Sequence, residues 1–553
     1  MPIGKRILIV GGVAGGASAA ARARRLSEDA EIILFERGKH VSFANCGMPY
    51  HIGGTISDRS RLLVQTPASL KARFRIEVRV ETEVISIDRK RRTVLVRDVA
   101  SGKDSTESYD VLILSPGAEP VHTPIPGADL ERVFTLRSMA DMDAIKKTVD
   151  GLPPRSGGAL VVGGGYIGLE MAEALRQRSL DVTLVELSGQ VFAPFDAEMA
   201  APLHQHLLAK GVDLRLNLAV KSIAAEGPTL RVQLSDSNAI SVGLVILAIG
   251  VRPEVKLARE AGLAIGPSGG ILVDAHMRTD DANIYAVGDA VEVENFVGHS
   301  KALIPLAGPA NRQGRIAADN IFGRPSTYQR TQGTAVCKVF DLTAGTTGLN
   351  EKTLKRLGKP YEKVYTHTAD HATYYPGATQ MSLKLLFSPL DGKIYGAQSV
   401  GTNGIDKRID VLAVAIRAGM TVMDLQDLEL SYAPPYGSAK DPVNYLGFVA
   451  TNVINNDLRL WHSDELPLQP DQVLLDVRTP TEVKAGTIPG SVNIPVDELR
   501  ERLGELSKDK ELFVFCQVGL RGYVACRILT QKGFKCRNLP GGYKTYQAAN
   551  LKF

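Results

Sequence analysis

Two cysteines stand in contexts that suit sulfur chemistry, and the first is Cys46. It lies in the stretch 42–50, which reads Ser-Phe-Ala-Asn-Cys-Gly-Met-Pro-Tyr, with no second cysteine nearby. A loop cysteine is usually a small buried hydrophobe, so this stretch alone leaves a redox thiol and a structural one both open. A reactive Cys46 without a neighbouring cysteine would store oxidation as a mixed disulfide, a persulfide or a sulfenic acid.

Cys516 is the second candidate. It follows the apolar run 512–515 and opens the sequence Cys-x-x-Gly-x-Arg, which leads into a predicted helix. A strand that feeds such a loop into a helix wraps backbone N–H groups around the sulfur, and the helix dipole favours a thiolate or a bound persulfide. A buried, inert cysteine is the alternative interpretation.

The remaining cysteines, Cys337, Cys526 and Cys536, have no comparable context and are interpreted as core or surface thiols. No cysteine pair or histidine cluster has the spacing of metal ligands, so no metal site is predicted. Five scattered cysteines do not form a disulfide framework and fit a reducing compartment. We therefore expect a cytoplasmic protein.

The composition describes an ordered globular chain. The 553 residues are 44% hydrophobic and include 53 glycines, which is enough for three or four domains. The net charge of +5, from 65 basic and 60 acidic residues, demands neither nucleic acid nor a membrane surface. No apolar segment approaches the roughly 20 residues that span a bilayer.

Two stretches have the pattern of a dinucleotide site. Residues 6–10 form an apolar run that leads into Gly-Gly-Val-Ala-Gly-Gly and a helical stretch, and Glu36 ends the next apolar run, 20 positions after Gly16. Glycines let the backbone approach a pyrophosphate at a helix N-terminus, and the acidic side chain accepts from ribose hydroxyls. Val13 stands where this motif expects its second glycine.

The second stretch carries all three glycines. The apolar run 159–162 precedes Gly-Gly-Gly-Tyr-Ile-Gly, a helix follows, and Glu186 ends the next apolar run. A carboxylate at position 186 would repel a 2′-phosphate, so this site is predicted to prefer NADH over NADPH.

Later segments indicate which dinucleotide each of the two sites binds. Residues 245–250 repeat the apolar run and turn of 111–117, and Gly288-Asp289 follows another apolar run. Together these features resemble the two-dinucleotide-domain flavoprotein disulfide reductases. The resemblance implies that FAD contacts Gly11, Gly12, Gly15, Gly16, Glu36 and Asp289, and that NADH contacts Gly163, Gly165, Gly168 and Glu186.

Within that group, the stretch around Cys46 is most similar to the coenzyme A disulfide reductases, and the resemblance spans residues 1 to about 449. It implies a homodimer in which Tyr374 and Tyr432 of one subunit flank the cysteine of the other. Phenolic hydroxyls can act there as general acids, although aromatic packing is the alternative. The positions that match coenzyme A contacts are Ser18, Arg22, Arg25, Ser42, Asn45, Asn311 and Lys440. Phe74 departs from a basic residue in the family, and Lys71, Arg73 or Arg75 could compensate.

The C-terminal part, about 469–550, resembles a rhodanese domain. The resemblance rests on the loop at Cys516, on Asp-Val-Arg at 476–478, on Gly-Ser-Val-Asn-Ile-Pro at 490–495 and on Gly-Gly-Tyr at 541–543. It implies that Cys516 carries sulfane sulfur and that Arg521 binds the substrate.

The predicted fold class is α/β, with two Rossmann-like dinucleotide-binding domains, one inserted in the other. An α+β dimerisation domain with strands near 334–340, 361–367, 381–387 and 393–400 follows them, and then a C-terminal α/β rhodanese domain. The expected boundaries are 1–118 and 251–325 for FAD binding, 119–250 for NAD binding, 326–449 for dimerisation, 450–468 for a linker and 469–553 for the rhodanese domain.

A flavin–thiol site and a sulfane-sulfur site on one chain suggest a shared substrate. We expect NADH-driven, FAD-dependent reduction of a coenzyme A persulfide or a polysulfide at Cys46, with release of sulfide and with Cys516 handling persulfide sulfur. One alternative is a coenzyme A disulfide reductase with an accessory rhodanese domain. Another is a sulfurtransferase whose flavoprotein part senses redox state. A peroxidase or an oxidase would leave Cys516 unexplained.

Overall fold

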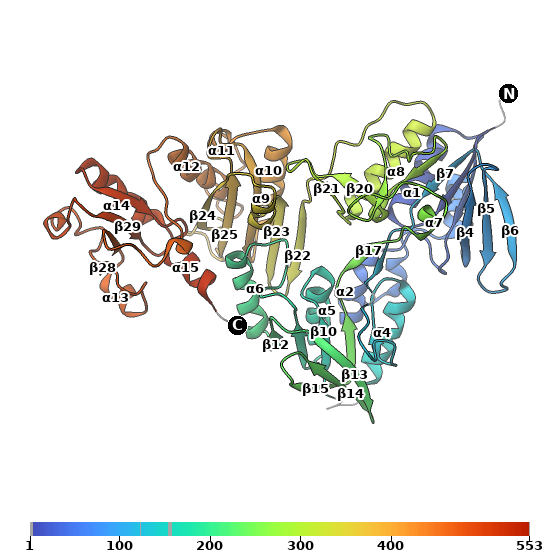
Figure 1. Cartoon of the computed structure of the whole chain (residues 1–553), viewed down its shortest axis with the longest axis horizontal. Helices are drawn as coiled ribbons and strands as arrows, with labels where there is room; N and C mark the ends of the chain where they lie inside the picture. Colours follow the sequence, from blue (N-terminus) through green and yellow to red (C-terminus); the bar gives the residue numbers. More distant parts are fainter. Residues whose placement is uncertain (1–3, 122, 153–156, 552–553) are drawn as a thin grey trace. The chain divides into compact units, whose positions relative to one another are not determined.

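The computed structural model describes residues 4–121, 123–152 and 157–551 (Figure 1). These residues form two compact units. The first unit is Met1–Leu187 with Asn217–Gly333, and the second is Ser188–Leu216 with Thr334–Phe553. Among the described residues, no helix combines the length and the apolar character needed to cross a bilayer.

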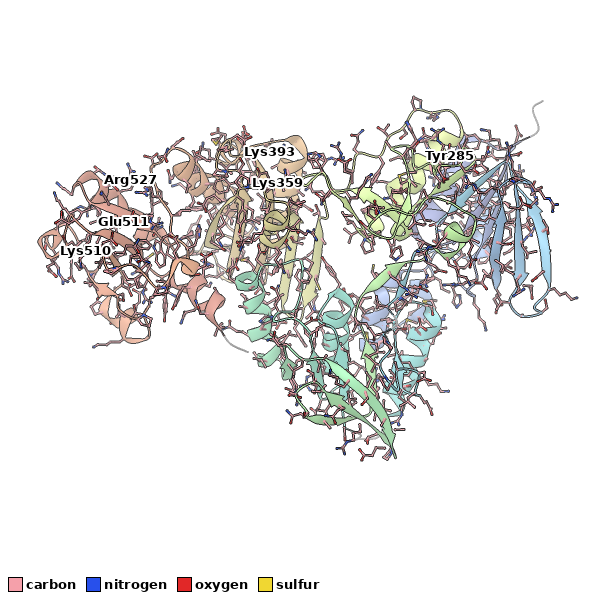
Figure 2. All side chains as sticks on the ribbon, in the orientation of Figure 1. Tyr285, Lys359, Lys393, Lys510, Glu511 and Arg527 are labelled. Carbon is pink, nitrogen blue, oxygen red and sulfur yellow. The ribbon has the colours of Figure 1, made fainter. Side chains whose placement is uncertain are left out.

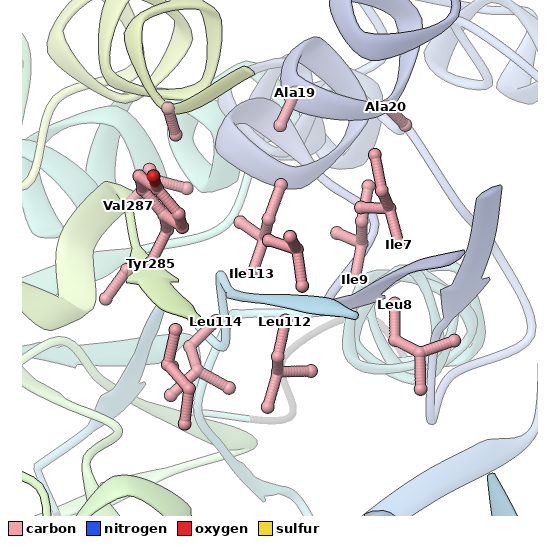
Figure 3. Packing of buried hydrophobic residues seen from close by; sticks show 14 of the residues in the cluster. Ile7, Leu8, Ile9, Ala19, Ala20, Leu112, Ile113, Leu114, Tyr285 and Val287 are labelled. Atoms are coloured by element: carbon pink, nitrogen blue, oxygen red, sulfur yellow. The ribbon is translucent and has the colours of Figure 1, made fainter. Parts of the chain in front are cut away.

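The first unit is built on two parallel sheets, and the first sheet has the strand order β19-β7-β1-β2-β3. Its strands are β1 (Arg6–Val10), β2 (Glu31–Phe35), β3 (Glu77–Arg79), β7 (Val111–Leu114) and β19 (Ile284–Ala286). Helices α1 (Ala14–Leu26) and α8 (Ala307–Ile321) pack together beside it. Ile7, Ile9 and Ile113 point toward α1 in the core (Figure 3). All four strand pairs are parallel, and β1, β2, β7 and β19 are mostly apolar, as expected for strands buried on both faces, whereas the edge strand β3 is Glu-Val-Arg.

The second sheet of the first unit includes the strands β11-β10-β16-β9 in that order. They are β9 (Val133–Phe134), β10 (Ala159–Val162), β11 (Val182–Val185) and β16 (Leu244–Leu247), and α5 (Tyr166–Gln177) follows β10. The chain leaves the first sheet after β7 and re-enters it at β19, and the antiparallel pair β8 (Ala118–Pro120) and β17 (Val251–Pro253) joins the two passages. One nucleotide-binding fold is therefore inserted in the other, as predicted.

Smaller elements complete the first unit. Antiparallel sheets form from β4 (Thr82–Asp88), β5 (Thr93–Asp98) and β6 (Asp104–Ser108), and from β13 (Val220–Glu226), β14 (Thr229–Leu234) and β15 (Ala239–Val242). The strands β18 (Ile271–Leu272), β20 (Val291–Glu294) and β21 (Lys301–Ala302) form a third. The helices are α2 (Met48–Gly53), α3 (Pro67–Phe74), α4 (Met139–Gly151) and α7 (Lys256–Glu260).

The second unit contains an antiparallel sheet in the order β22-β23-β26-β25-β24. Its strands are β22 (Ala335–Val339), β23 (Leu342–Gly348), β24 (Glu362–Ala369), β25 (Gln380–Phe387) and β26 (Ile394–Gly401). The helices are α9 (Glu351–Arg356), α10 (Ile405–Ala418), α11 (Val422–Gln426) and α12 (Pro442–Ile454). The segment Ser188–Leu216, with α6 (Ala197–Ala209) and β12 (Val212–Arg215), also belongs to this unit.

The C-terminal domain, from Leu458 onward, has a parallel sheet in the order β28-β27-β29-β30. Its elements are β27 (Gln472–Asp476), α13 (Pro480–Lys484), β28 (Val492–Asn493), β29 (Glu511–Phe515), α14 (Leu520–Gln531), β30 (Lys535–Asn538) and α15 (Gly542–Asn550). The predicted linker 450–468 is largely structured, because α12 runs to Ile454 and both Leu458 and Trp461 are buried in the domain's core.

The C-terminal domain packs on the antiparallel sheet of the same unit. His367 Nε2 on β24 lies 2.9 Å from Thr545 Oγ1 on α15. The backbone at Gly541 also approaches so closely that a Cβ there would lie 2.9 Å from Cβ of Tyr365. Burial, with the charge of Lys544, lowers the pKa of His367 to about 3, so this imidazole is neutral at physiological pH.

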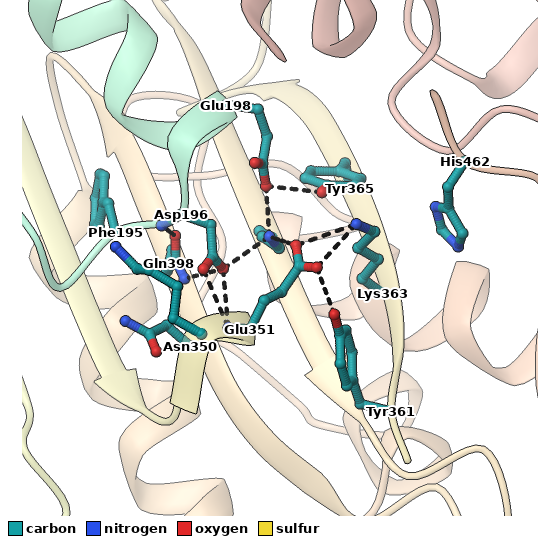
Figure 4. Close-up of polar contacts among 12 residues, drawn as sticks. Phe195, Asp196, Glu198, Asn350, Glu351, Tyr361, Lys363, Tyr365, Gln398 and His462 are labelled. Atoms are coloured by element: carbon teal, nitrogen blue, oxygen red, sulfur yellow. Dashed lines mark hydrogen bonds and ion pairs between the residues drawn. The ribbon is translucent and has the colours of Figure 1, made fainter. Parts of the chain in front are cut away.

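A buried lysine ties the segment that carries α6 to the antiparallel sheet (Figure 4). Lys384 on β25 is fully buried, and its ammonium lies 2.8 Å from Asp196 Oδ2 and also bonds to Glu198 and Glu351. The three carboxylates surround this ammonium, which fills the position that a metal cation would take. Burial alone would raise the pKa of Glu351, but the charge of Lys384 holds it well below its usual value.

We expect Lys384→Met to be strongly destabilising. The substitution keeps the volume but leaves the carboxylates of Asp196, Glu198 and Glu351 buried without their counter-ion, a loss of about 3–5 kcal/mol for a broken buried ion pair. Thermal unfolding should show a transition temperature lowered by several degrees. The control is Lys393→Met, at an exposed lysine (Figure 2), which should leave the transition unchanged. Equal transitions for both variants would contradict this account.

Candidate functional site

The first glycine turn lies between β1 and α1. Gly11 has φ +92°, and a Cβ on Gly16 would lie 1.9 Å from the Gly11 carbonyl oxygen, so glycine is required at this crossing. Glu36, after β2, accepts hydrogen bonds from the Gly12 N–H at 3.0 Å and the Gly38 N–H at 2.9 Å. Val13 does not break the motif, because it only caps α1. The turn and helix N-terminus fit the pyrophosphate of a dinucleotide.

Asp289 lies beside this first turn. It sits in the 3-10 turn Gly288–Ala290 after β19, and a Cβ on Gly15 would lie 2.9 Å from Cγ2 of Val287. Burial raises the pKa of Asp289, and the charge of Arg137 opposes that rise. The carboxyl ends of β1 and β19 thus bring the glycine turn and Asp289 together, an arrangement that fits FAD.

The second glycine turn repeats this geometry between β10 and α5. Gly163 has φ +103°, and a Cβ on Gly168 would lie 1.8 Å from the Gly163 carbonyl oxygen. Glu186 accepts from the Gly164 N–H at 2.7 Å. Gly165 has no atom within 4 Å of its would-be Cβ, so open space remains where a nucleotide phosphate would approach. The residues fit a second dinucleotide.

Cys46 lies in a short 3-10 turn, Asn45–Gly47, just before α2. Its thiol is exposed and lies 3.9 Å from Asn45 Oδ1. Desolvation by the surrounding protein raises the pKa of this thiol, and the Glu170 and Asp289 carboxylates raise it further. The first unit therefore brings the lone thiol near the acidic residue that fits FAD.

Glu170 is a site residue that sequence reasoning missed. It lies on α5, two residues after the last fingerprint glycine, and accepts a hydrogen bond from the Tyr50 hydroxyl at 3.3 Å. Burial, with the nearby Glu173, raises the pKa of Glu170 to about 7, although the Tyr50 hydrogen bond lowers it. An acidic residue in the mostly apolar first turns of α5 was the available sequence signal.

A cavity of about 330 Å³ gathers most of the predicted substrate-binding residues. Ser18, Arg22 and Arg25 on α1, Asn311 on α8 and Ser42 all line it. Ser18 donates to Asn311 Oδ1 at 2.7 Å. Asn45 and Lys440 lie elsewhere, Asn45 beside Cys46 and Lys440 before α12 in the second unit.

The same cavity also contains residues outside that set. Gln65 and Arg315 contribute to its lining, and Phe74 forms part of its wall. The Arg25 guanidinium lies 5.4 Å from the centre of the Phe74 ring, so this aromatic residue helps to position a cation in the cavity wall. Arg22 pairs with Asp319 at 2.6 Å, which fixes its orientation.

Tyr374 and Tyr432 meet in the second unit. Their hydroxyls are 2.7 Å apart, and their exposed fractions are 73% and 47%. Arg408 holds the two loops together by donating to the carbonyl of Asp370 at 2.7 Å and to Asp441 at 2.9 Å. Two exposed phenols joined by a hydrogen bond form a polar pair that another surface can cover.

The C-terminal domain places Cys516 at the end of β29, fully buried. The Gly519 N–H points at its sulfur, with the nitrogen 3.1 Å from Sγ, and Gly519 has φ +102°. The Tyr543 N–H bonds to the Cys516 carbonyl at 2.7 Å, which fixes the loop from behind. One backbone N–H of the loop, that of Gly519, therefore faces the sulfur.

Arg521, which was predicted to bind the substrate, is paired with a carboxylate of its own domain. It pairs with both oxygens of Glu482, at 2.8 Å and 2.5 Å, and this contact lowers the pKa of Glu482 to about 2. Arg478, buried beside the loop, donates to Gln517 Oε1 at 3.1 Å and lies over the Tyr543 ring. The loop thus has a second cation next to it that was not predicted.

Comparisons with known proteins identify the family that each part of the chain resembles. Residues 5–314 match the family Pyridine nucleotide-disulphide oxidoreductase, residues 334–441 match the dimerisation domain of that family, and residues 461–549 match the Rhodanese-like domain. A coenzyme A disulfide reductase from Staphylococcus haemolyticus is 35% identical over 81% of this chain and 100% of its own length. An NADH oxidase from Methanocaldococcus jannaschii is 35% identical over 82% of this chain and 100% of its own.

Two solved structures match nearly the whole chain. Reduced Bacillus anthracis CoADR-RHD has a TM-score of 0.96 and 50% identity, covering 99% of this chain and 98% of its own. A NAD-dependent persulfide reductase from A. fulgidus has a TM-score of 0.91 and 38% identity, covering 98% of this chain and 100% of its own.

We expect Glu170→Gln to speed alkylation of Cys46. Removing the carboxylate lowers the Cys46 pKa and raises the thiolate fraction, so the iodoacetamide rate should rise about two- to tenfold, as for loss of a charge interaction of about 1 kcal/mol. Because the pKa of Glu170 is about 7, the difference from wild type should open as pH rises through that value. The control is Glu226→Gln, on β13; identical rates for all three proteins above pH 8 would contradict the prediction.

Proposed function

This chain belongs to the pyridine nucleotide-disulphide oxidoreductase family, and on that premise we propose that it uses NADH to reduce the sulfane sulfur of a coenzyme A persulfide or a polysulfide. The observation that carries the proposal is the pairing, on one chain, of a solitary thiol beside a dinucleotide fold with a second sulfur cradled by a backbone N–H. The rhodanese-like C-terminal domain gives the second sulfur its role.

Each of the two glycine turns would bind one dinucleotide cofactor. The family uses FAD with NADH or NADPH, and the first turn with Asp289 would hold FAD while the second would hold the nicotinamide dinucleotide. Bound FAD would relay two electrons from the nicotinamide to sulfur at Cys46. The Glu186 carboxylate would accept from the ribose hydroxyls and would repel a 2′-phosphate, which supports NADH over NADPH.

Cys46 carries the sulfur step. Its thiolate attacks the carbon-bound sulfur of the persulfide, a bond forms between that sulfur and Sγ, and the S–S bond of the substrate breaks with release of HS⁻. The mixed disulfide then takes up two electrons and one proton, which returns the Cys46 thiolate and free coenzyme A thiol. The pKa of Glu170 is raised to about 7, so this carboxyl group can take up or release a proton at neutral pH next to the Tyr50 hydroxyl.

The cavity between α1 and α8 would bind coenzyme A. Arg22, Arg25 and Arg315 supply positive charge for its phosphates, and Ser18 with Asn311 supplies neutral hydrogen bonds. Ser42 lines this cavity and stands four residues before Cys46, so the chain runs directly from the cavity to the thiol.

Cys516 would accept or deliver sulfane sulfur. The Gly519 N–H stabilises negative charge on the sulfur, and Arg478, whose own charge is paired with Asp476 at 2.7 Å, orients the loop by donating to Gln517. Arg521 would bind the anionic substrate, with Glu482 fixing its guanidinium.

We further propose a cytoplasmic homodimer. The residues 334–441 match a dimerisation domain, and the exposed Tyr374 and Tyr432 pair lies on it. Across a dimer, these phenols of one copy would face Cys46 of the other and donate to the leaving thiolate. The proposed domain boundaries remain those of the sequence except at the linker, which shortens to the residues between Ile454 and Leu458.

A coenzyme A disulfide reductase with an accessory rhodanese domain is the second candidate, favoured by the name of the Staphylococcus haemolyticus relative. The two candidates differ in the preferred substrate, so kcat/KM for coenzyme A disulfide and for coenzyme A persulfide, measured side by side with NADH, separates them.

We expect Cys46→Ser to lower NADH-dependent sulfide release from coenzyme A persulfide by about a thousandfold or more, as for loss of a nucleophile. The control is Cys337→Ser, at a buried thiol on β22, which should retain activity. Sulfide release at the normal rate by Cys46→Ser would end the proposal.

We expect Arg25→Ala to raise the KM for coenzyme A persulfide about tenfold or more, because a hydrogen bond to a charged phosphate contributes about 1.5–3 kcal/mol. The KM for inorganic polysulfide, which has no phosphate, should not change. Arg91→Ala, at an exposed turn, is the control. A rise of equal size for both substrates would place Arg25 outside the coenzyme A site.

A further inference from the structure

The loop that carries Cys516 is supported from behind by the N-terminus of α15. The first N–H groups of a helix have no acceptor within the helix, and in α15 two of them donate to this loop. The Tyr543 N–H donates to the Cys516 carbonyl at 2.7 Å, and the Lys544 N–H donates to the Gln517 carbonyl at 3.0 Å. A Cβ on Gly542 would lie 2.4 Å from the Cys516 carbonyl oxygen, so the two backbones are in close contact. The position of α15 therefore sets the position of the loop.

The same two bonds orient the peptide groups of the loop. In a trans peptide the C=O and the N–H point in opposite directions, so the N–H groups of Gln517 and Val518 point away from α15. The next N–H along the chain, that of Gly519, faces Cys516 Sγ with the nitrogen at 3.1 Å. A shift of α15 would turn these peptide groups and move the N–H that stabilises negative charge on the sulfur.

A chain of hydrogen bonds anchors the start of α15 to the antiparallel sheet of the preceding domain. The Thr545 hydroxyl donates to the carbonyl of Gly541, the N-cap of α15, at 3.2 Å, so its oxygen accepts from Nε2 of His367 at 2.9 Å. The imidazole is neutral and has one N–H, which leaves Nδ1 to accept from the Ser382 hydroxyl at 2.8 Å. Side chains of β24 and β25 thus hold the residue at which α15 begins.

Two further contacts fix α15 on this sheet. Lys544 Nζ donates to Gln380 Oε1 on β25 at 3.0 Å. Tyr365 on β24, whose Cβ approaches Gly541, donates its hydroxyl to Glu198 on α6 at 2.8 Å. The location of α15 is therefore determined by residues outside the C-terminal domain.

We propose that His367 is a positioning residue for sulfur transfer at Cys516, acting through Thr545 and the N-terminus of α15. It comes from β24 and so lies outside the domain that carries the reacting sulfur. The inference rests on the proposed function in one respect, which is that it takes sulfur transfer as the reaction of Cys516.

The transfer is measured without NADH, with thiosulfate as the donor and cyanide as the acceptor. The Cys516 thiolate attacks the outer sulfur of thiosulfate, the S–S bond breaks, and sulfite leaves with the electron pair of that bond. Cyanide then takes the outer sulfur of the Cys516 persulfide as thiocyanate, and the thiolate is restored. Rates are measured in the full-length protein, well below the unfolding temperature of each variant.

We expect Thr545→Val to lower kcat for thiocyanate formation about tenfold, as for a small displacement of a reacting group. The KM for thiosulfate should not change, because Arg521 is held separately by Glu482 on α13. Thr545→Ser keeps the hydroxyl and should retain the wild-type kcat. The control is Gln547→Ala, at an exposed position of the same helix, which should also retain it.

His367→Leu should lower kcat as much as Thr545→Val does. The variant with both substitutions should be no slower than either single one, because each removes the same hydrogen bond. Losses that multiply in the double variant, or a loss that Thr545→Ser shares, would overturn the proposal.

Hydrogen exchange tests the positioning without turnover. In His367→Leu, the peptides that contain the Cys516 loop and the start of α15 should exchange faster than in the wild type, while the peptide that contains β27 should not change. Unchanged exchange at the loop, or an unchanged kcat in both His367→Leu and Thr545→Val, would overturn the positioning role alone. A wild-type protein that forms no thiocyanate would instead contradict sulfur transfer at Cys516, and the inference would fall with it.

Discussion

The approach of one backbone to another at a glycine is the constraint on which both dinucleotide sites depend. At each site the last glycine of the motif lies against the carbonyl oxygen of the first, with no room for a Cβ. Gly16 lies against Gly11, and Gly168 lies against Gly163. This contact lets the helix start directly at the carboxyl end of the strand, so that its first N–H groups point to where phosphate binds. The carboxylates of Asp289, in the turn after β19, and of Glu170, on α5, both raise the pKa of Cys46.

In the second unit, buried cations join segments of the chain that come from different elements. Lys384 joins α6, α9 and β25 through one ammonium, and a lysine that is fully buried has no alternative position in water. Arg408 does the same for the loops of Tyr374 and Tyr432. In both places a single cation organises segments that are far apart in the chain, at the cost of burying charge.

Local patterns in the sequence were sufficient to predict several of these sites and elements. The glycine turns, Glu36, Glu186 and the Cys516 loop were predictable because each is a short stretch whose function follows from its own backbone. Four strands of the antiparallel sheet and α10 were also predicted, although β25 and β26 are buried along nearly their whole length and do not alternate between a buried and an exposed face. The resemblance to known families added the residues of the cavity between α1 and α8, five of which do lie together.

Contacts between distant segments were not predictable. Glu170 meets Tyr50 across two domains, and Gln65 joins a cavity whose other residues come from α1, α8 and the segments around Ser42 and Phe74. The linker between domains appeared polar and proline-containing, yet Trp461 within it is fully buried, because tertiary packing decides burial where the local sequence is ambiguous. Arg521 matched its motif, but the sequence could not show that Glu482 would engage it.

The packing of α15 against β24 makes the rhodanese-like domain part of a larger body. His367 remains an uncharged imidazole only while Thr545 and Gly541 cover it, and Tyr365 relies on the same cover. Cutting the chain near Leu458 would expose this neutral, aromatic surface to water, and the imidazole would regain its charge below about pH 6.5. The module is therefore not interchangeable with an unrelated rhodanese domain, and shortened or chimeric forms would need a redesigned β24 face to stay monodisperse.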